Sequence, residues 1–319
     1  MKALVRLLCV GVALLLTFSL TGCDRPTEPF RVGTNVWIGY EPLYLAQDLG
    51  LYGNAPVRMV TLPNATEAQQ ALRAGVVEAA ALTLDEALTM KQDGLDLRVI
   101  AVMDTSHGAD VLLAKPTLRS LEQLKGKRVG VESTATGVLM LHEALAAVKL
   151  GVKDIDMVYL TVDQHEAAFR EGRIDALVTF EPVRTQLLAQ GAHVLFDSSR
   201  IPGRIVDVLV TTGANSSRYA DTLRQLLLGH FQALERLQAD PLKAAVHMTA
   251  RQGLRAEQVV ASFQGVRIPS VQDSREMLTG APSPLQRSAQ QLQDVMLAHK
   301  MLAKPSVLDG MFDPSLLPP

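Results

Sequence analysis

The sequence predicts an α/β protein built from two similar lobes, because one strand–helix–strand unit occurs twice. In both copies an arginine stands two residues before the glycine that ends the helix, and Glu78 aligns with Asp175. A third strand–loop–helix junction lies between the copies. Units of this kind predict parallel strands joined by crossover helices, and hence two mixed sheets flanked by helices. The copies comprise 57–62, 65–74 and 77–83, and then 157–161, 163–171 and 174–180.

The first 23 residues have the pattern of an export signal. Two basic residues precede an apolar run at 7–18, which is well short of the roughly 20 residues that span a bilayer. The sequence Leu-Thr-Gly-Cys at 20–23 is similar to a bacterial lipobox. It implies a signal peptide at 1–22, a lipid-modified Cys23 and a linker at 23–30. The alternative is a signal peptide that is cleaved without lipidation.

Composition and motifs exclude several classes of function. The formal net charge of −2, without runs of like charge, argues against nucleic-acid binding and against a polybasic membrane patch. Cys9 leaves with the signal and Cys23 would carry lipid, so no thiol remains for a disulfide or a thiolate metal site. His142 and His165 each precede a glutamate, but neither motif has the second histidine of a zinc helix. We interpret both as solvated helix residues and expect neither a metal nor a cofactor.

The remaining elements follow from hydrophobic periodicity and from Gly and Pro punctuation. A polar loop is expected at 104–110 after a buried strand, and a hydroxyl- and glycine-rich loop at 132–137 after another. After Gly213 the pattern becomes helical. The expected strands are 30–37, 97–103, 111–114, 127–131 and 204–212, and the expected helices are 42–49, 121–124, 138–148, 218–239, 241–252, 255–263 and 285–302.

Candidate ligand residues lie where predicted strands end, because open α/β sheets bind ligands at the carboxyl ends of their strands. Trp37, the only tryptophan, could stack on a ligand or pack in the core. The loop at 132–137 could bind a ligand through free helix amides, or be an ordinary turn with Ser133 as N-cap. Asp85 and Glu86 could instead cap a helix, and Asp110 and Asp207 could be structural acids. The candidates are Asn35, Trp37, Tyr40, Thr83, Asp85, Ser106, His107, Ser133, Thr134, Thr136 and Glu181.

Four segments carry a resemblance to a known family. They are Trp37-Ile-Gly-Tyr-Glu-Pro42, Thr83-Leu-Asp-Glu86, the stretch S-L-x-x-L-K-G-K-R-V-G-V with its loop at 120–137, and Thr179-Phe-Glu-Pro182. In this order they resemble solute-binding proteins of the nitrate/sulfonate/taurine and thiamine-pyrimidine type, the extracytoplasmic receptors of ABC importers. The resemblance implies the type II periplasmic binding protein fold and a monomer that is not an enzyme. Its partners would be a small organic solute, an ABC permease with its ATPase, and the membrane that holds its lipid anchor at the extracytoplasmic or periplasmic face of the cell envelope.

The family has two extended segments that join its lobes. We therefore expect lobe 1 at 31–109 and 213–319, lobe 2 at 110–212, and hinge strands near 110–116 and 206–212. The alternatives to a transport receptor are a pyrimidine-synthesis enzyme on the same fold and a receptor that presents ligand to a membrane sensor.

The loops point to two kinds of solute. Helix N-termini and the hydroxyls of the loop at 132–137 would suit a sulfonate, nitrate or carboxylate. The cleft-facing loops also hold several acids but no Lys or Arg, and a buried carboxylate costs several kcal/mol unless it is paired. This favours a neutral or cationic, amine-bearing heterocycle such as an aminopyrimidine, stacked on Trp37 with Glu181 or Asp85 accepting its N–H groups. A zwitterion such as taurine would use both halves. The acids concerned are Asp85, Glu86, Asp104, Glu132 and Glu181.

Overall fold

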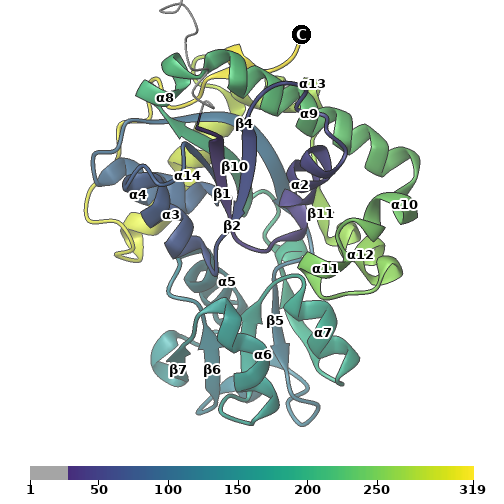
Figure 1. The fold of residues 1–319 in the computed structure, drawn as a ribbon. Coiled ribbons are helices and arrows are strands. Elements are labelled where there is room, and N and C mark those ends of the chain that lie inside the picture. Colours follow the sequence, from purple (N-terminus) through teal and green to yellow (C-terminus); the bar gives the residue numbers. More distant parts are fainter. Residues whose placement is uncertain (1–27) are drawn as a thin grey trace, which may run out of the picture.

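Two sheets, each covered by helices, form the upper and lower lobes of the molecule in the computed structural model (Figure 1). The structure describes residues 28–319, so the predicted signal peptide at 1–22 and Cys23 lie outside the described residues. Phe30 already belongs to the first strand and is buried, so the linker is shorter at its end than the predicted 23–30.

The sheet of lobe 1 is six-stranded, in the order β11-β4-β10-β3-β1-β2. Its β1, β2 and β3 run parallel, whereas β10 is antiparallel to both β3 and β4. Both faces are covered, which is why β3 and β4 read as nearly continuous apolar runs. The strands are β1 (Phe30–Thr34), β2 (Val57–Thr61), β3 (Ala79–Thr83), β4 (Leu97–Ser106), β10 (Val206–Thr212) and β11 (Val266–Arg267).

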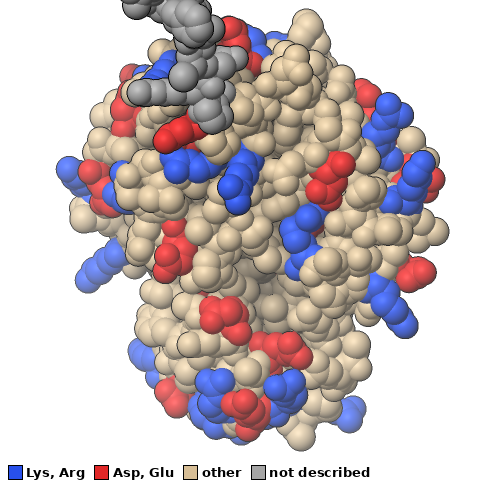
Figure 2. Space-filling view, viewed as in Figure 1, with Lys and Arg blue, Asp and Glu red and all other residues tan. Residues whose placement is uncertain are grey.

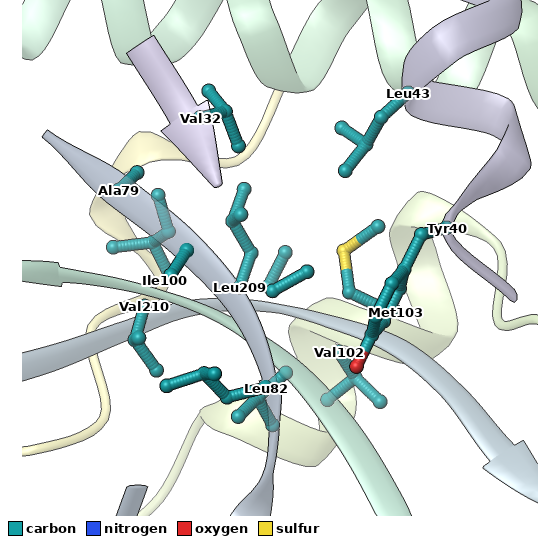
Figure 3. Packing of buried hydrophobic residues seen from close by; sticks show 14 of the residues in the cluster. Val32, Tyr40, Leu43, Ala79, Leu82, Ile100, Val102, Met103, Leu209 and Val210 are labelled. Carbon is teal, nitrogen blue, oxygen red and sulfur yellow. The ribbon is translucent and has the colours of Figure 1, made fainter. Parts of the chain in front are cut away.

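Helices from both ends of the described chain cover this sheet. Figure 3 shows Val32, Leu82, Ile100 and Leu209 meeting in one buried cluster, to which the C-terminal helices also contribute. The α-helices are α2 (Glu41–Asp48), α3 (Ala65–Arg73), α4 (Leu84–Gln92), α8 (Gly213–Arg218), α9 (Ala220–Ala239), α10 (Pro241–Val246), α11 (Thr249–Gln252), α12 (Ala256–Ser262), α13 (Val271–Leu278) and α14 (Pro284–Ala298). Short 3₁₀ helices add η2 (Ile38–Tyr40), η6 (Phe263–Gly265) and η7 (Pro314–Leu316).

The sheet of lobe 2 is five-stranded, in the order β7-β6-β8-β5-β9. Alternate residues of β5 face opposite sides: Leu112 packs in one apolar cluster, and Val111 and Leu113 in another. Its strands are β5 (Val111–Ala114), β6 (Arg128–Val131), β7 (Asp156–Tyr159), β8 (Ala176–Thr179) and β9 (His193–Asp197). Its helices are η3 (Leu121–Leu124), α5 (Ala135–Ala146), η4 (Val152–Asp154), α6 (Val162–Arg170), α7 (Val183–Ala189) and η5 (Ser198–Arg200).

The two repeats share a local plan that explains the aligned acids. In each lobe a central strand, β1 or β6, pairs in parallel with both strands of the repeated unit. An arginine near the start of that central strand binds the acid 47 residues later: Arg31 Nη2 lies 2.6 Å from Glu78 Oε1, and Arg128 Nη2 lies 2.8 Å from Asp175 Oδ1. The two sheets that form the cleft therefore share the same strand pairing and the same arginine–acid pair.

One predicted boundary is wrong. The strand at 206–212 was assigned to lobe 2, but β10 pairs with β3 and β4 and lies near the middle of the lobe 1 sheet. The chain thus enters lobe 2 between Ser106 and Val111 and returns between Arg200 and Val206. Sequence alone could not place β10, because a buried apolar strand fits either sheet. No helix of the described residues is long and apolar enough to cross a membrane.

Candidate functional site

A cavity between the two lobes is walled by side chains from both. It encloses about 590 Å³ between its atoms, part of which is open to solvent. Ligand pockets for small molecules measure roughly 300–1,000 Å³, so the cavity suits a compact solute. Figure 2 shows the molecular face hollowed between the lobes. The lining consists of Asn35, Trp37, Tyr40, Ala65, Thr83, Glu86, Asp110, Glu132, Thr134, Thr136, Gly137, Met140, His165, Val178, Phe180, Ile205 and Asp207.

Strand ends place four of these residues. Asn35 follows β1, Thr83 ends β3, Glu132 follows β6 and Phe180 follows β8. These are the central strand of each lobe and the last strand of each repeated unit, which run parallel to each other. The repeated unit found in the sequence therefore predicts which strand ends contribute residues to the cavity wall.

Trp37 packs in the core, one of the two alternatives that the sequence left open, and its place in the cavity lining leaves stacking on a ligand as a prediction. It belongs to the buried cluster of lobe 1 and also lines the cavity. Its indole Nε1 donates to Asp104 Oδ2 at 2.9 Å, and its ring meets Phe180 edge-on, with centroids 5.6 Å apart. A side chain at Gly39 would put its Cβ 1.8 Å from Asp104 Oδ2, so only glycine allows this arrangement. Trp37 and Phe180 form an apolar wall that both lobes share.

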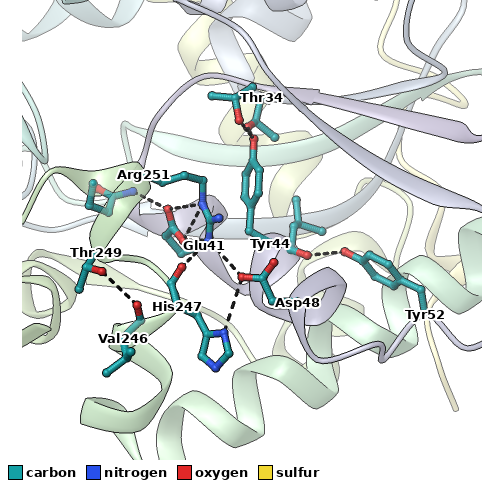
Figure 4. A network of polar contacts seen from close by, with 12 residues as sticks. Thr34, Glu41, Tyr44, Asp48, Tyr52, Val246, His247, Thr249 and Arg251 are labelled. Carbon is teal, nitrogen blue, oxygen red and sulfur yellow. Dashed lines mark hydrogen bonds and ion pairs between the residues drawn. The ribbon is translucent and has the colours of Figure 1, made fainter.

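Helix α2 holds the loop of Trp37 and Tyr40 through a buried ion pair (Figure 4). Glu41 begins this helix and is 2% exposed; Arg251 Nη2 of α11 lies 2.7 Å from its Oε2, and Gln252 Nε2 lies 2.7 Å from its Oε1. The guanidinium of Arg251 also lies 4.2 Å from the ring centroid of Tyr44. These contacts fix the start of α2 against the C-terminal helices, and so fix the cleft residues that precede it.

The lining holds four carboxyl groups, Glu86, Asp110, Glu132 and Asp207, and no Lys or Arg among the described residues. Two of the four have partners inside the protein. Glu86 accepts from the backbone N–H of Thr83 at 2.9 Å, and Asp207 accepts from the hydroxyl of Tyr40. Burial, followed by the negative charge of Asp85, raises the pKa of Glu86 to about 8. Burial, with the charge of Asp104 adding to it, raises the pKa of Asp207 well above its ordinary value.

Asp110 and Glu132 are the two carboxyl groups whose acceptors are still available. Asp110 is 6% exposed, and its Oδ2 has no hydrogen-bond partner among the described residues. Glu132 is 9% exposed, and no described residue donates to its carboxyl group within hydrogen-bond distance. Burial raises the pKa of each to about 7. Each is a desolvated acceptor that faces the cavity and would gain from a donor or a cation there.

The N-terminus of α5, where an anion was expected to bind, is in contact with Asp85 across the cleft. Asp85 lies at the start of α4 in lobe 1, and its Oδ2 accepts from the backbone N–H of Thr136 at 2.9 Å. Its Oδ1 accepts from the hydroxyl of the same threonine at 2.6 Å. The N-cap of α5 is Thr134 and not Ser133, the alternative that the sequence suggested. The lobes are therefore connected by a carboxylate bound to a helix N-terminus.

The interpretation of His165 as a solvated helix residue is wrong. It is fully buried and lines the cavity, with Nδ1 3.0 Å from Thr179 Oγ1 and with Nε2 lacking a partner among the described residues. Burial lowers its pKa to about 4, so the ring is neutral at pH 7. Sequence placed it on α6 correctly but could not show which face of that helix turns toward the cleft. His142 is partly buried and stands beside His299.

Not every predicted site residue lines the cavity. Six do: Asn35, Trp37, Tyr40, Thr83, Thr134 and Thr136. Asp85, Ser106, His107, Ser133 and Glu181 lie outside its lining. Ser106 Oγ lies 2.7 Å from Ser198 Oγ at the crossing between the lobes, and His107 Nε2 lies 2.9 Å from Arg267 Nη2.

The position of Glu181 argues against its predicted contact with ligand. It is fully buried, and its carboxylate accepts from Arg184 Nη1 at 2.9 Å and from the backbone N–H of Thr185 at 3.1 Å. Its charge is thus satisfied at the first turn of α7. Asp110, Glu132, Phe180 and Asp207 line the cavity in addition to the predicted residues. The signal for Glu132 and Phe180 was a predicted strand end: Phe180 is the last residue of the strand predicted at 174–180, and Glu132 directly follows the strand predicted at 127–131. No group of three or more His, Cys, Asp or Glu side chains in the described part of the chain could hold a metal ion.

With this geometry in place, the chain can be compared with known proteins. An Escherichia coli (strain K12) protein that is named for binding aliphatic sulfonates is 25% identical over 206 residues, which are 62% of this chain and 64% of that protein. The chain therefore matches less than two thirds of that relative's length.

Solved structures share the fold at lower identity. The alkanesulfonate-binding protein of Xanthomonas axonopodis pv. citri bound to MOPS has a TM-score of 0.73 at 20% identity, covering 88% of this chain and 96% of its own. The ligand-binding component of an ABC-type import system from Staphylococcus aureus has a TM-score of 0.75 at 17% identity, covering 91% and 98%. A desulfurization enzyme has a TM-score of 0.62 at 16% identity, covering 90% and 97%.

These structures confirm the predicted two-lobed periplasmic binding protein fold. The model of one family, described as NMT1-like, matches residues 24–251, which include the repeated units, both crossings and every residue that lines the cavity. Because this match covers most of the chain, the protein belongs to the NMT1-like family.

Proposed function

We propose that this protein is the solute-binding component of an ABC importer, which captures a small organic solute between its lobes and delivers it to a permease and its ATPase. One observation carries the proposal: the cavity is enclosed by both lobes, so a ligand in it contacts both. A ligand that binds the closed arrangement better than the open one shifts the population toward closure. The names of the matched transport proteins support the same function.

Closure would occur about the two crossings of the chain. Each is a short loop of bends and turns, at 107–110 between β4 and β5 and at 201–205 between η5 and β10, and loops of this kind absorb domain rotation. The lobes contact each other through Trp37 and Phe180 and through Asp85 and Thr136. Opening would break these contacts and expose the cavity, while leaving each sheet intact.

The proposal includes lipid anchoring at Cys23, which would hold the protein at the extracytoplasmic face of the membrane. A single acyl chain gives only reversible binding, and more than one anchors stably. Incorporation of labelled fatty acid into the protein, and its loss in Cys23→Ser, tests this anchoring separately from solute binding. A protein that is exported without label would retain the proposed transport function and lose only its anchor.

Ligand-dependent stabilisation tests the transport proposal directly. Solutes to be screened are aminopyrimidines, thiamine fragments, taurine, alkanesulfonates, nitrate and polyamines. At about 100 times its Kd, a ligand adds roughly 2.7 kcal/mol to the free energy of unfolding, which a thermal melt detects. Because Trp37 is the chain's only tryptophan and lines the cavity, its fluorescence reports occupancy independently. Loss of the thermal stabilisation in Trp37→Ala, a variant that has no tryptophan fluorescence to follow, locates the solute in the cleft; a panel without any stabilising solute counts against the proposal.

The same fold also occurs in a desulfurization enzyme, so solute turnover requires its own measurement. Incubation of the protein with any stabilising solute, followed by mass spectrometry, distinguishes the two functions. Recovery of unchanged solute supports a binding protein. Stoichiometric or catalytic conversion would assign the cavity to an enzyme instead. Uptake of that solute in cells with and without the permease then separates transport from presentation to a membrane sensor.

A further inference from the structure

We infer that the cleft selects a cation: the ammonium or amidinium end of the solute lies between Asp110 and Glu132, while the protein's own Asp85 occupies the position that an anionic solute would need. This inference rests on the proposed solute-binding function and names its substrate class. Three steps lead to it: the state of the α5 N-terminus, two carboxyl groups that can still accept hydrogen bonds, and the chemistry of the rest of the cavity.

The first step is that three amides in the first turn of α5, those of residues 136–138, already have partners inside the protein. Thr136 donates its N–H to Asp85, and Gly137 donates to Thr134 Oγ1 at 3.2 Å. The next N–H, that of Val138, lies 3.1 Å from the carbonyl oxygen of Thr134. A sulfonate at this helix would have to displace a carboxylate that is 3% exposed, and would then face its negative charge. The partial positive charge of this helix N-terminus therefore already interacts with the carboxyl group of Asp85.

The second step concerns two carboxyl groups that can still accept hydrogen bonds: a hydrogen bond with the Ser106 side chain lowers the pKa of Asp110 against the larger effect of burial, but Asp110 Oδ2 has no partner among the described residues. The buried Oδ2 of Asp110 accepts no hydrogen bond, and no described residue donates to the carboxyl group of Glu132. Both line the cavity, Asp110 from the crossing into lobe 2 and Glu132 from the end of β6. A primary ammonium brings three donors and an amidinium brings a planar set, and either forms charge-assisted hydrogen bonds with carboxylates. An anion brings no donor and adds a negative charge beside whichever of the two acids is ionised.

The third step is that the rest of the lining adds neutral donors but no cation: the buried Oγ1 of Thr83 has no partner among the described residues, and Asn35 carries an amide. Glu86 and Asp207 are negative when ionised and neutral when protonated, so neither supplies a positive charge. His165 is neutral at pH 7. Asp85, Asp104 and Glu181 stand behind the lining and are negative when ionised. The rest of the lining includes an apolar wall that would take the body of the solute: Trp37, Met140, Val178, Phe180 and Ile205. Aromatic faces in this wall favour a cationic or heteroaromatic body.

Matched pairs of probes test the inference. Butylamine is compared with butanesulfonate, and benzamidine with benzoate, by thermal shift and by Trp37 fluorescence on the purified protein. We expect the two cations to bind and the two anions not to bind. Cation affinity should fall at least tenfold in Asp110→Asn and in Glu132→Gln, and should not change in Glu122→Gln, an exposed glutamate of the same lobe.

The outcomes separate this inference from the proposed function. Binding of anions without cations, or cation binding that survives both cleft substitutions, overturns the inference and leaves a solute-binding cleft. If none of the four probes binds, while an uncharged member of the larger panel does, the cation preference is likewise overturned. If no solute of either panel binds, the proposed function also fails.

A gain of function provides the second test. Asp85→Ala frees the first-turn amide and the hydroxyl of Thr136 and removes one negative charge. We expect butanesulfonate to bind this variant at least tenfold more tightly than the parent protein. Leu88→Ala, at a buried position of the same helix, is the control for a general loosening of α4. Equal gains in both variants, or none in Asp85→Ala, would contradict the role of Asp85 as an internal anion.

Discussion

Replacing Asp110 by asparagine should make the ligand-free protein more stable while it weakens the site. The pKa of Asp110 lies near 7 in the folded protein and at 3.8 in an unfolded chain, mainly because burial disfavours its charged form. That difference corresponds to about 4 kcal/mol at pH values above 7, where the native carboxylate is ionised. Asparagine keeps the shape of the side chain and removes the charge, so most of this cost should disappear.

The sign of the pH dependence follows from proton binding. Between about pH 4 and pH 7 the folded protein binds more protons at Asp110 than the unfolded chain does. The wild-type protein therefore loses stability as pH rises through this window, and Asp110→Asn lacks this part of the loss. The two proteins should have similar free energies of unfolding at pH 4 and should differ by about 4 kcal/mol at pH 8.

Equilibrium urea denaturation at half-unit steps from pH 4 to pH 8.5 measures this difference. Other acids of the cleft titrate in both proteins, so the difference between the curves isolates Asp110. Glu122→Gln, an exposed control, should show no such divergence. A variant that is less stable than wild type at pH 8, or a difference that does not change with pH, would show that the Asp110 carboxylate is solvated or already paired. Reduced cation binding by the same variant would show that the carboxylate that destabilises the ligand-free protein is also the one that binds the cation.

Three further perturbations have outcomes that the structure determines. Cation affinity should rise between pH 6 and pH 8, because a bound cation displaces protons from Asp110 and Glu132, whose pKa values lie near 7. Isothermal titration in buffers of different ionisation enthalpy should detect the released protons. Gly39→Ala places a Cβ 1.8 Å from Asp104 Oδ2, so urea denaturation should show a loss of about 2 kcal/mol and the Trp37 emission should shift; an unchanged spectrum would contradict the predicted clash. Arg251→Ala leaves the buried Glu41 without its cation and should cost about 3 kcal/mol, whereas Arg224→Ala, which removes an exposed ion pair, should melt as wild type does.

The fold could be predicted because its signals are local and repeated. The two βαβ units with their aligned acids, and the strand–loop–helix junction before α5, appear as such in the structure. The sheet to which β10 belongs was not predictable, because apolar strands of similar length fit the centre of either sheet. Strand β9 and helices α7 and α13 were not predicted, since their short, partly exposed sequences carry weak periodicity.

The site shows a different limit of sequence reasoning. Sequence identified many acids near the strand ends, but it could not say which of them have partners. Asp85 and Glu181 occupy similar positions, after the last strand of each repeat, and each accepts a backbone N–H in the first turn of a helix: Asp85 from α5 of the other lobe, Glu181 from its own α7. Glu132, directly after β6, has no such partner among the described residues. Whether an acid has a hydrogen-bond partner depends on distances between segments in the folded protein, and the spacing of residues along the sequence does not give those distances.

These partners decide what kind of solute the cleft favours. Without a ligand, the buried carboxyls of the cleft reduce their charge by taking up protons, which is why burial raises the pKa of Asp110 and Glu132 to about 7. A proton and a cationic solute thus compete for the same two acids. The solute wins if it supplies donors to both at once, since a proton satisfies only one carboxyl group. The competition favours a diffuse or polydentate cation, such as an amidinium or an aminopyrimidinium, over a small hydrated one. Asp85 makes the α5 side of the same cleft unfavourable for sulfonates, because it accepts from the N–H and the hydroxyl of Thr136 in the first turn of that helix.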